Sequence, residues 1–172
     1  GKAMGNGYPI TAIIGRSKLM SFANKTFISS TFLSEALGPV AAIETIKLMS
    51  KNKTYNYILK TGKQIKNNWI RISKKTGLGI EVFGLDSIPK FKFLHKESNF
   101  IKTIFTYEML KKNFLAGNAV YVSTAHTKKI LKEYYKNTEQ IFSKIAKVIK
   151  KKNFKKIYQM KESLTDFGRL NW

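Results

Sequence analysis

The organisation of this chain shifts near residues 50–55, and that shift limits the folds open to it. Before this point, two short apolar runs with strand character, residues 9–16 and 27–32, alternate with helical segments. The second run leads into an expected helix over residues 34–49, for which Ser34 is the expected N-cap. Strands that alternate with helices are typical of an α/β fold with a parallel sheet.

Beyond the change, the pattern predicts a self-contained α+β unit. Strand alternation with one wet face replaces the buried apolar runs, and two long helical stripes flank it. In chain order the expected elements are helix, strand, strand, helix, strand and helix, over residues 55–73, 80–83, 90–94, from Ser98 onward, 119–122 and 127–150. We therefore divide the chain into part of an α/β domain, residues 1–52, and a small α+β domain, residues 53–172.

The first of these segments does not complete a domain by itself. A parallel sheet needs both of its faces covered, and residues 1–52 supply too few elements to cover them. We therefore expect this chain to be the C-terminal part of a longer α/β protein.

Lysine dominates the charge of the chain. The formal net charge is +22, and 29 of the 32 basic residues are lysine, since arginine occurs only at Arg16, Arg71 and Arg169. Recognition of base edges and bidentate binding of phosphate favour the guanidinium group of arginine. We interpret the charge mainly as solvated surface and expect no nucleic-acid partner. The alternative is a lysine-rich, non-catalytic module that binds nucleic acid or another anion, and it predicts a steep salt dependence of binding.

The composition excludes several further classes of protein and of functional site. The hydrophobic share of 43% indicates a folded core, and the absence of cysteine excludes disulfides and thiolate metal sites. No apolar run approaches the roughly 18 residues that a membrane helix needs, so a cytoplasmic protein without a membrane partner is expected. His95 and His126 are the only histidines. A metal site or a Ser-His-Asp triad is therefore not expected.

Lys2 is the first candidate functional residue. It stands in the run Gly1-Lys2-Ala3-Met4-Gly5-Asn6-Gly7-Tyr8-Pro9-Ile10, where a Gly-x-Gly turn follows it closely. A neutral lysine amine forms imines with carbonyl compounds, and the turn would let the backbone pass close to a flat ligand. A plain surface charge is the alternative. The Gly-Lys pair is not a P-loop, because that motif needs Ser or Thr where Ala3 stands.

Thr31 is the second candidate, because it ends an expected strand just ahead of an expected helix. A hydroxyl group together with the backbone N–H groups of a helix start forms an anion site. An ordinary threonine at the end of a strand is the alternative.

The order of these motifs resembles class III pyridoxal-phosphate-dependent aminotransferases, and most closely the branch around glutamate-1-semialdehyde aminomutase. The matching motifs are the run that contains Lys2, then Gly15-Arg16, Ser30-Thr31-Phe32 and an alanine-rich helix at residues 39–45. The C-terminal domain of that branch is similar at Tyr107 through Leu110, Gly117, Tyr121 and Ser123-Thr124-Ala125-His126-Thr127.

The resemblance implies a fold and a site. Residues 1–52 would be the C-terminal portion of the large domain of fold type I, and the small domain would follow. Lys2 matches the catalytic lysine that holds pyridoxal 5'-phosphate as a Schiff base and moves protons between substrate and cofactor. Thr31 matches the threonine that binds the cofactor phosphate across the interface of a homodimer. The family pattern after this threonine, Phe-Gly-Gly-Asn-Pro, is replaced here by residues 32–39, which leaves the substrate open.

The implied reaction is transamination between a small-molecule amino donor and a carbonyl acceptor. An aminomutase, which carries out both half-reactions on one substrate, is the alternative within the same family. In the family, the acid that pairs with the pyridine nitrogen, the aromatic residue that stacks on the ring and the phosphate loop all precede the lysine. Because this chain lacks them, we expect it to be inactive alone.

Overall fold

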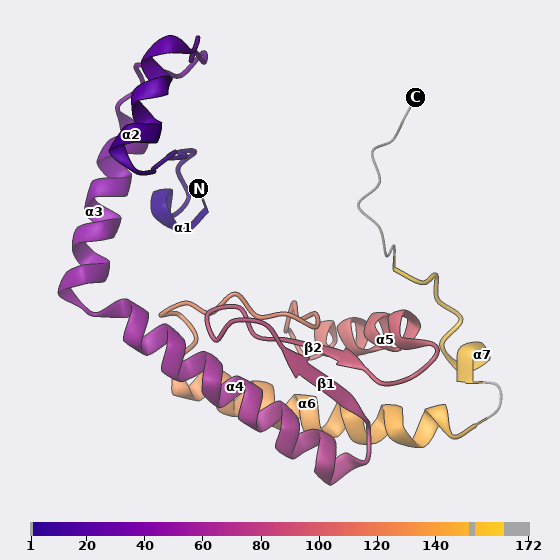
Figure 1. Ribbon diagram of the computed structural model, residues 1–172. Coiled ribbons are helices and arrows are strands. Elements are labelled where there is room, and N and C mark those ends of the chain that lie inside the picture. Colours follow the sequence, from indigo (N-terminus) through magenta and orange to yellow (C-terminus); the bar gives the residue numbers. More distant parts are fainter. Residues whose placement is uncertain (1, 152–153, 164–172) are drawn as a thin grey trace, which may run out of the picture. The chain divides into compact units, whose positions relative to one another are not determined.

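The computed structural model describes residues 2–151 and 154–163, and the chain divides into two compact units, Gly1–Tyr55 and Asn56–Trp172. Figure 1 shows the course of the chain through both units. Gly1, which opens the run that contains Lys2, lies outside the described residues. Among the described helices, none combines the length and the apolar character that crossing a membrane requires.

The first unit consists of helices joined by segments without regular secondary structure. In chain order these are α1 (Lys2–Gly5), α2 (Ser17–Met20), the 3-10 helix η1 (Ser21–Lys25) and α3 (Leu37–Lys51). Helix α1 packs against α3, and α2 continues directly into η1. The expected helix over 34–49 is thus confirmed, with bounds shifted by two to three residues.

The two expected strands of this unit are wrong. Residues 9–16 and 27–30 have no regular secondary structure, and residues 31–34 form a turn. A strand needs a neighbour for its backbone N–H and C=O groups, and the described part of this unit offers none. Apolar side chains of both runs therefore lie in solvent, with Ile14 90% and Phe27 93% exposed.

Helix α3 begins later than expected because Glu35, and not Ser34, satisfies its first N–H groups. The Glu35 carboxylate accepts hydrogen bonds from the N–H of Leu37 at 2.6 Å and of Gly38 at 3.1 Å. A carboxylate at this end also complements the positive pole of the helix dipole. Pro39 follows in the first turn, where its missing N–H costs no hydrogen bond.

The second unit contains the α+β arrangement that the sequence predicts. Its elements are α4 (Thr54–Thr76, which begins just before the unit boundary), β1 (Ile80–Phe83), β2 (Lys90–Phe93), α5 (Ser98–Leu110), α6 (Lys128–Ile149) and α7 (Phe154–Tyr158). The two strands pair antiparallel in the register Ile80↔Phe93. Gly77 follows the last residue of α4, and its φ of 71° suits a residue without Cβ at this turn.

The strand expected at residues 119–122 is reduced to a single bridge between Ala119 and Lys90. Beside it, the side-chain amide of Asn118 donates to the carbonyl of Phe91 at 2.9 Å, where a backbone N–H of a third strand would pair. Further along, Val120 donates from its backbone to Pro89 at 3.0 Å. The segment therefore runs along β2 without building a regular ladder.

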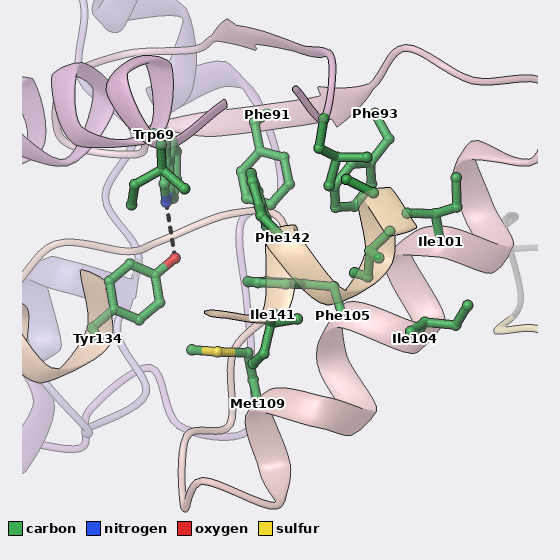
Figure 2. Close-up of a cluster of buried hydrophobic side chains, with 14 of the residues drawn as sticks. Trp69, Phe91, Phe93, Ile101, Ile104, Phe105, Met109, Tyr134, Ile141 and Phe142 are labelled. Atoms are coloured by element: carbon green, nitrogen blue, oxygen red, sulfur yellow. Dashed lines mark hydrogen bonds between the residues drawn. The ribbon is translucent and has the colours of Figure 1, made fainter. Parts of the chain in front are cut away.

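The core of the second unit lies on one face of the two strands. Phe91 and Phe93 of β2 point into it while Lys92 between them is exposed, as strand alternation predicts. Figure 2 shows side chains from α4, α5 and α6 closing around these two rings. The fully buried side chains around them include Ile65, Trp69, Ile72, Ile101, Ile104, Phe105, Met109 and Phe142.

A buried hydrogen bond links α4 to α6 through this core. The indole N–H of Trp69 donates to the hydroxyl oxygen of Tyr134 at 3.0 Å (Figure 2). Burial raises the pKa of Tyr134 to about 12, so its hydroxyl stays protonated at neutral pH. Two aromatic side chains with polar ends can therefore be buried here without leaving either polar group unpaired.

Gly62 marks a close approach between α4 and the β1–β2 turn. A Cβ atom at this position would lie 1.6 Å from the carbonyl oxygen of Asp86, which belongs to the backbone. In an exposed helix, replacing Gly by Ala stabilises by about 1 kcal/mol. We expect the opposite sign for Gly62→Ala, a loss of about 1–3 kcal/mol in the free energy of unfolding, because the turn must move.

Urea denaturation followed by circular dichroism measures this effect. Gly117→Ala is the matched control, since a Cβ there meets nothing within 4 Å, and it should change stability by less than about 0.5 kcal/mol. Equal stability of the two variants would contradict the close approach.

Candidate functional site

Lys2 lies on the first helix of the first unit and is exposed to solvent. The backbone N–H of Asn6 bonds to its carbonyl at 3.2 Å, and Tyr8 bonds to Gly5 at 3.1 Å, so the chain turns sharply after α1. Asn6 and Gly7 both have positive φ, 46° and 112°. The tight turn predicted after Lys2 is confirmed, and glycine and asparagine are the residues that tolerate it.

Two glycines let this turn lie close to the start of α3. A Cβ on Gly5 would be 2.8 Å from Cγ2 of Ile10. A Cβ on Gly38 would be 3.0 Å from the carbonyl oxygen of Pro9 and 3.3 Å from Cβ of Ile10. The segment Pro9-Ile10 therefore lies against both α1 and α3, and this packing holds the short helix that carries Lys2.

Thr31 lies in an exposed turn ahead of α3. The turn is closed by a backbone bond from Leu33 to Ser30 at 3.1 Å, and the hydroxyl of Ser30 accepts from the N–H of Phe32 at 3.2 Å. Thr31 thus belongs to the same unit as Lys2.

The anion site expected at the helix start differs from the prediction. The N–H groups of Leu37 and Gly38, which an anion would use, already bond to the carboxylate of Glu35. A carboxylate at this place also repels a second anion. Any phosphate contact from this region therefore depends on the Thr31 hydroxyl and on the turn around it.

The chemistry of these groups fits pyridoxal 5'-phosphate, but the first unit does not enclose it. A primary amine, a threonine hydroxyl and a glycine-lined turn are the groups that an aldehyde, a phosphate and a flat ring require. A lysine becomes nucleophilic when burial or a nearby cation favours its neutral form, and Lys2 is exposed here. In the described part of this unit, Ala42 is the one buried hydrophobic residue, so an apolar enclosure must come from elsewhere.

Both histidines have local structural partners. Nδ1 of His126 accepts the backbone N–H of Ser123 at 3.0 Å, and Nδ1 of His95 accepts that of Glu97 at 3.1 Å. Within residues 2–151 and 154–163, no group of three or more His, Cys, Asp or Glu side chains could hold a metal ion.

Sequence reasoning missed a nearly buried carboxylate in the second unit. Glu108 on α5 is 8% exposed and bonds to Nζ of Lys144 on α6 at 2.8 Å and of Lys111 at 3.3 Å. Burial acts to raise the pKa of Glu108, but the two lysines outweigh it and hold the pKa below 4.5. The spacing of Glu108 and Lys111, three residues apart on a helix, was the available signal. The cluster joins α5 to α6 and is structural.

Acid should weaken this link. Because the pKa of Glu108 is lower in the folded chain than in the unfolded one, its stabilisation is present above pH 4.5 and is lost as pH falls through the folded value. We expect Glu108→Gln to lower the free energy of unfolding at pH 7 by about 1–3 kcal/mol. The variant should also lose less stability than the parent between pH 5 and pH 3, about a one-unit span on each side of the ordinary carboxyl pKa.

Chemical denaturation at several pH values measures both effects. Glu44→Gln is the control, because its pair with Lys47 is exposed on both sides and contributes little. A parallel pH profile for parent and Glu108→Gln would contradict the assignment.

No protein-family model matches the chain, but individual proteins do. It is 31% identical over 107 residues to 3-aminobutyryl-CoA aminotransferase of Cloacimonas acidaminovorans. The aligned segment covers 62% of this chain and 26% of the relative. It is 25% identical to aminopentol aminotransferase of Sphingopyxis macrogoltabida, over 86% of this chain and 35% of the relative. Glutamate-1-semialdehyde 2,1-aminomutase of Thermodesulfovibrio yellowstonii is 24% identical over 84% of this chain and 38% of its own length.

The fold agrees with these relatives. The solved structure of the pyridoxal-phosphate internal aldimine form of the Sphingopyxis sp. MTA144 FumI protein superposes with a TM-score of 0.79 at 25% identity, over 87% of this chain and 37% of that one. The chain is therefore similar, in sequence and in fold, to the C-terminal part of fold type I transaminases. It spans 26–38% of the length of the relatives and the structure named here.

Proposed function

We propose that this chain, which resembles the C-terminal part of class III pyridoxal-phosphate-dependent aminotransferases, supplies the lysine of such an enzyme. The observation that supports this most is that the transaminase likeness extends over most of the chain, while Lys2 lies beside a turn lined by glycines. In this proposal residues 1–52 belong to the cofactor-binding domain, and residues 53–172 form the small domain.

Lys2 and Thr31 are the residues that we propose hold the cofactor. Pyridoxal 5'-phosphate, when bound, supplies the electron-withdrawing ring that stabilises negative charge on the substrate carbon. Nζ of Lys2 would attach the cofactor, and after release would take a proton from one carbon and return it to another. The hydroxyl of Thr31 would donate a hydrogen bond to the phosphate.

The exposed apolar side chains of the first unit support the proposal that this part is covered in the active assembly. Ile13, Ile14, Phe27 and Phe32 are 75–93% exposed, which is costly for residues of this size. We propose that further elements of the cofactor-binding domain and a second subunit of a homodimer cover them.

The experiment compares two preparations with the cofactor added. One is the 172-residue chain alone, and the other is the chain completed by an N-terminal part that carries the missing elements of the cofactor site. We expect the completed protein to show the visible absorbance of lysine-bound cofactor, to lose it on borohydride reduction, and to transfer an amino group. Robust turnover by the chain alone would contradict the need for completion, and a colourless completed protein would contradict the proposal.

Two alternatives have their own outcomes in the same experiment. Release of a keto product from the amino donor indicates an aminotransferase, whereas rearrangement of one substrate without a released keto product indicates an aminomutase, which the relative from Thermodesulfovibrio yellowstonii supports. A colourless protein with salt-sensitive affinity for nucleic acid would instead indicate the lysine-rich binding module. A cytoplasmic location stays a prediction from the sequence.

A further inference from the structure

A cavity of about 370 Å³ lies in the second unit, between the end of β2 and the start of α5. Three lysines line it, Lys92, Lys96 and Lys102. This volume lies in the range of small-molecule sites, roughly 300–1,000 Å³, so the cavity can take a compact ligand.

The fold brings the three lysines together from separate places. Lys92 lies on the wet face of β2, opposite to the buried rings of Phe91 and Phe93. Lys96 lies in the connection to α5, and Lys102 lies one turn into that helix and is half-buried. These three lysines, from β2, the connection and α5, line the same cavity.

The opposite wall comes from the end of the described chain. The side-chain amide of Asn99 donates to the carbonyl of Ser163 at 2.6 Å, and the hydroxyls of Thr103 and Ser163 lie 3.0 Å apart. These bonds tie residues 162–163 to α5, and Glu162 lines the cavity as a result. The cavity is therefore built by long-range contacts and is not merely a run of surface lysines.

The charge inside the cavity is positive. The carboxylate of Glu97 accepts a hydrogen bond from Nζ of Lys155 at 2.6 Å, and that hydrogen bond lowers the pKa of Glu97. Across the part of the chain that the structure describes, Lys92, Lys96 and Lys102 form no ion pair within 4.0 Å. The first turn of α5 also faces the cavity through Ser98 and Asn99, and the positive pole of the helix adds to the field. Glu162 is left as the opposing charge.

We infer that this cavity is a binding site for a small anion that carries a phosphate group. Lysine ammonium groups bind phosphate as point charges, and three lysines line this cavity. The size of the cavity favours a phosphate monoester or pyrophosphate over a nucleic acid. The site does not depend on the proposed reaction, since it uses neither Lys2 nor Thr31.

Titration of the 172-residue chain with pyrophosphate and with inorganic phosphate at constant ionic strength tests the site. We expect saturable binding by calorimetry, with amide shifts in nuclear magnetic resonance spectra concentrated at residues 96–102. The double variant Lys96→Gln, Lys102→Gln should bind roughly tenfold more weakly. Glu162→Gln should bind more tightly, because it removes the opposing charge.

The matched control is Lys128→Gln, Lys129→Gln, which removes the same charge from the exposed first turn of α6. It should change affinity by less than about twofold. Equal weakening by both double variants, or shifts spread over all the lysines, would overturn the proposal in favour of non-specific attraction. If the cavity variant does not fold, the shift map of the parent protein still decides between these outcomes.

Discussion

Lys2→Ala should abolish transamination by the cofactor-loaded, completed protein. Proton transfer by a positioned side chain contributes about 10²–10⁴-fold to a rate, so we expect kcat to fall by at least about this factor. The variant also loses the amine that would attach the cofactor. Borohydride reduction followed by peptide mapping should therefore find the cofactor mass on the peptide of Lys2 in the parent protein and not in the variant.

Two companion variants separate the role of the amine from the role of its charge. Lys2→Arg keeps the positive charge, but the guanidinium group does not lose its proton in proteins, so this variant should be as inactive as Lys2→Ala. Lys18→Ala removes an exposed lysine from α2 of the same unit and should keep the parent rate. Substantial activity in Lys2→Ala, with the cofactor attached to another lysine, would refute the assignment of Lys2.

The largest effect on stability is expected for Phe91→Ala in the core of the second unit. The Phe91 ring is fully buried, and the ring centroids of Trp69, Phe93, Phe105 and Phe142 lie 4.8–5.8 Å from it. These five rings come from four elements, β2, α4, α5 and α6. No single element can therefore move to fill the cavity that removal of the Phe91 ring would leave. We expect a loss of about 3–5 kcal/mol in the free energy of unfolding, from lost burial and the cavity together.

Urea denaturation, followed by far-ultraviolet circular dichroism, measures this loss. Leu94→Ala is the matched control, because Leu94 comes directly after β2 and is 63% exposed. It should change stability by less than about 0.5 kcal/mol. A loss below about 1 kcal/mol for Phe91→Ala would contradict the central place of this ring.

The second unit was largely predictable because its elements bury their own side chains. The apolar stripes of α4 and α6 have helical spacing, and the alternation in β2 separates Phe91 and Phe93 from Lys92. Each pattern indicates which face of the helix or strand packs against the core, and that core lies within the same unit. The strand expected at 119–122 is reduced to a single bridge, because Pro89, which accepts from Val120, has no N–H to complete the ladder there.

The first unit shows the opposite case. Its runs at 9–16 and 27–32 have the apolar character of buried strands, yet they form no strand and are largely exposed. The apolar side chains of these runs show that the residues are suited to burial. A strand forms, however, only where another strand pairs with its backbone. The candidate site shows the same dependence on partners distant in the chain. The sequence indicated Lys2 and Thr31 as site residues, and both are exposed in the described unit.

The sequence alone therefore determined residue types and local periods. It indicated Lys2 beside a tight glycine turn, the helices and hairpin of the second unit, and the resemblance to aminotransferases. Only the tertiary structure decided what depends on partners distant in the chain. It showed Glu35 at the start of α3, Glu108 between Lys111 and Lys144, and three lysines around one cavity. Contacts between residues far apart in the sequence determine which side chains are buried and which groups they bond to. Local sequence patterns do not contain this information.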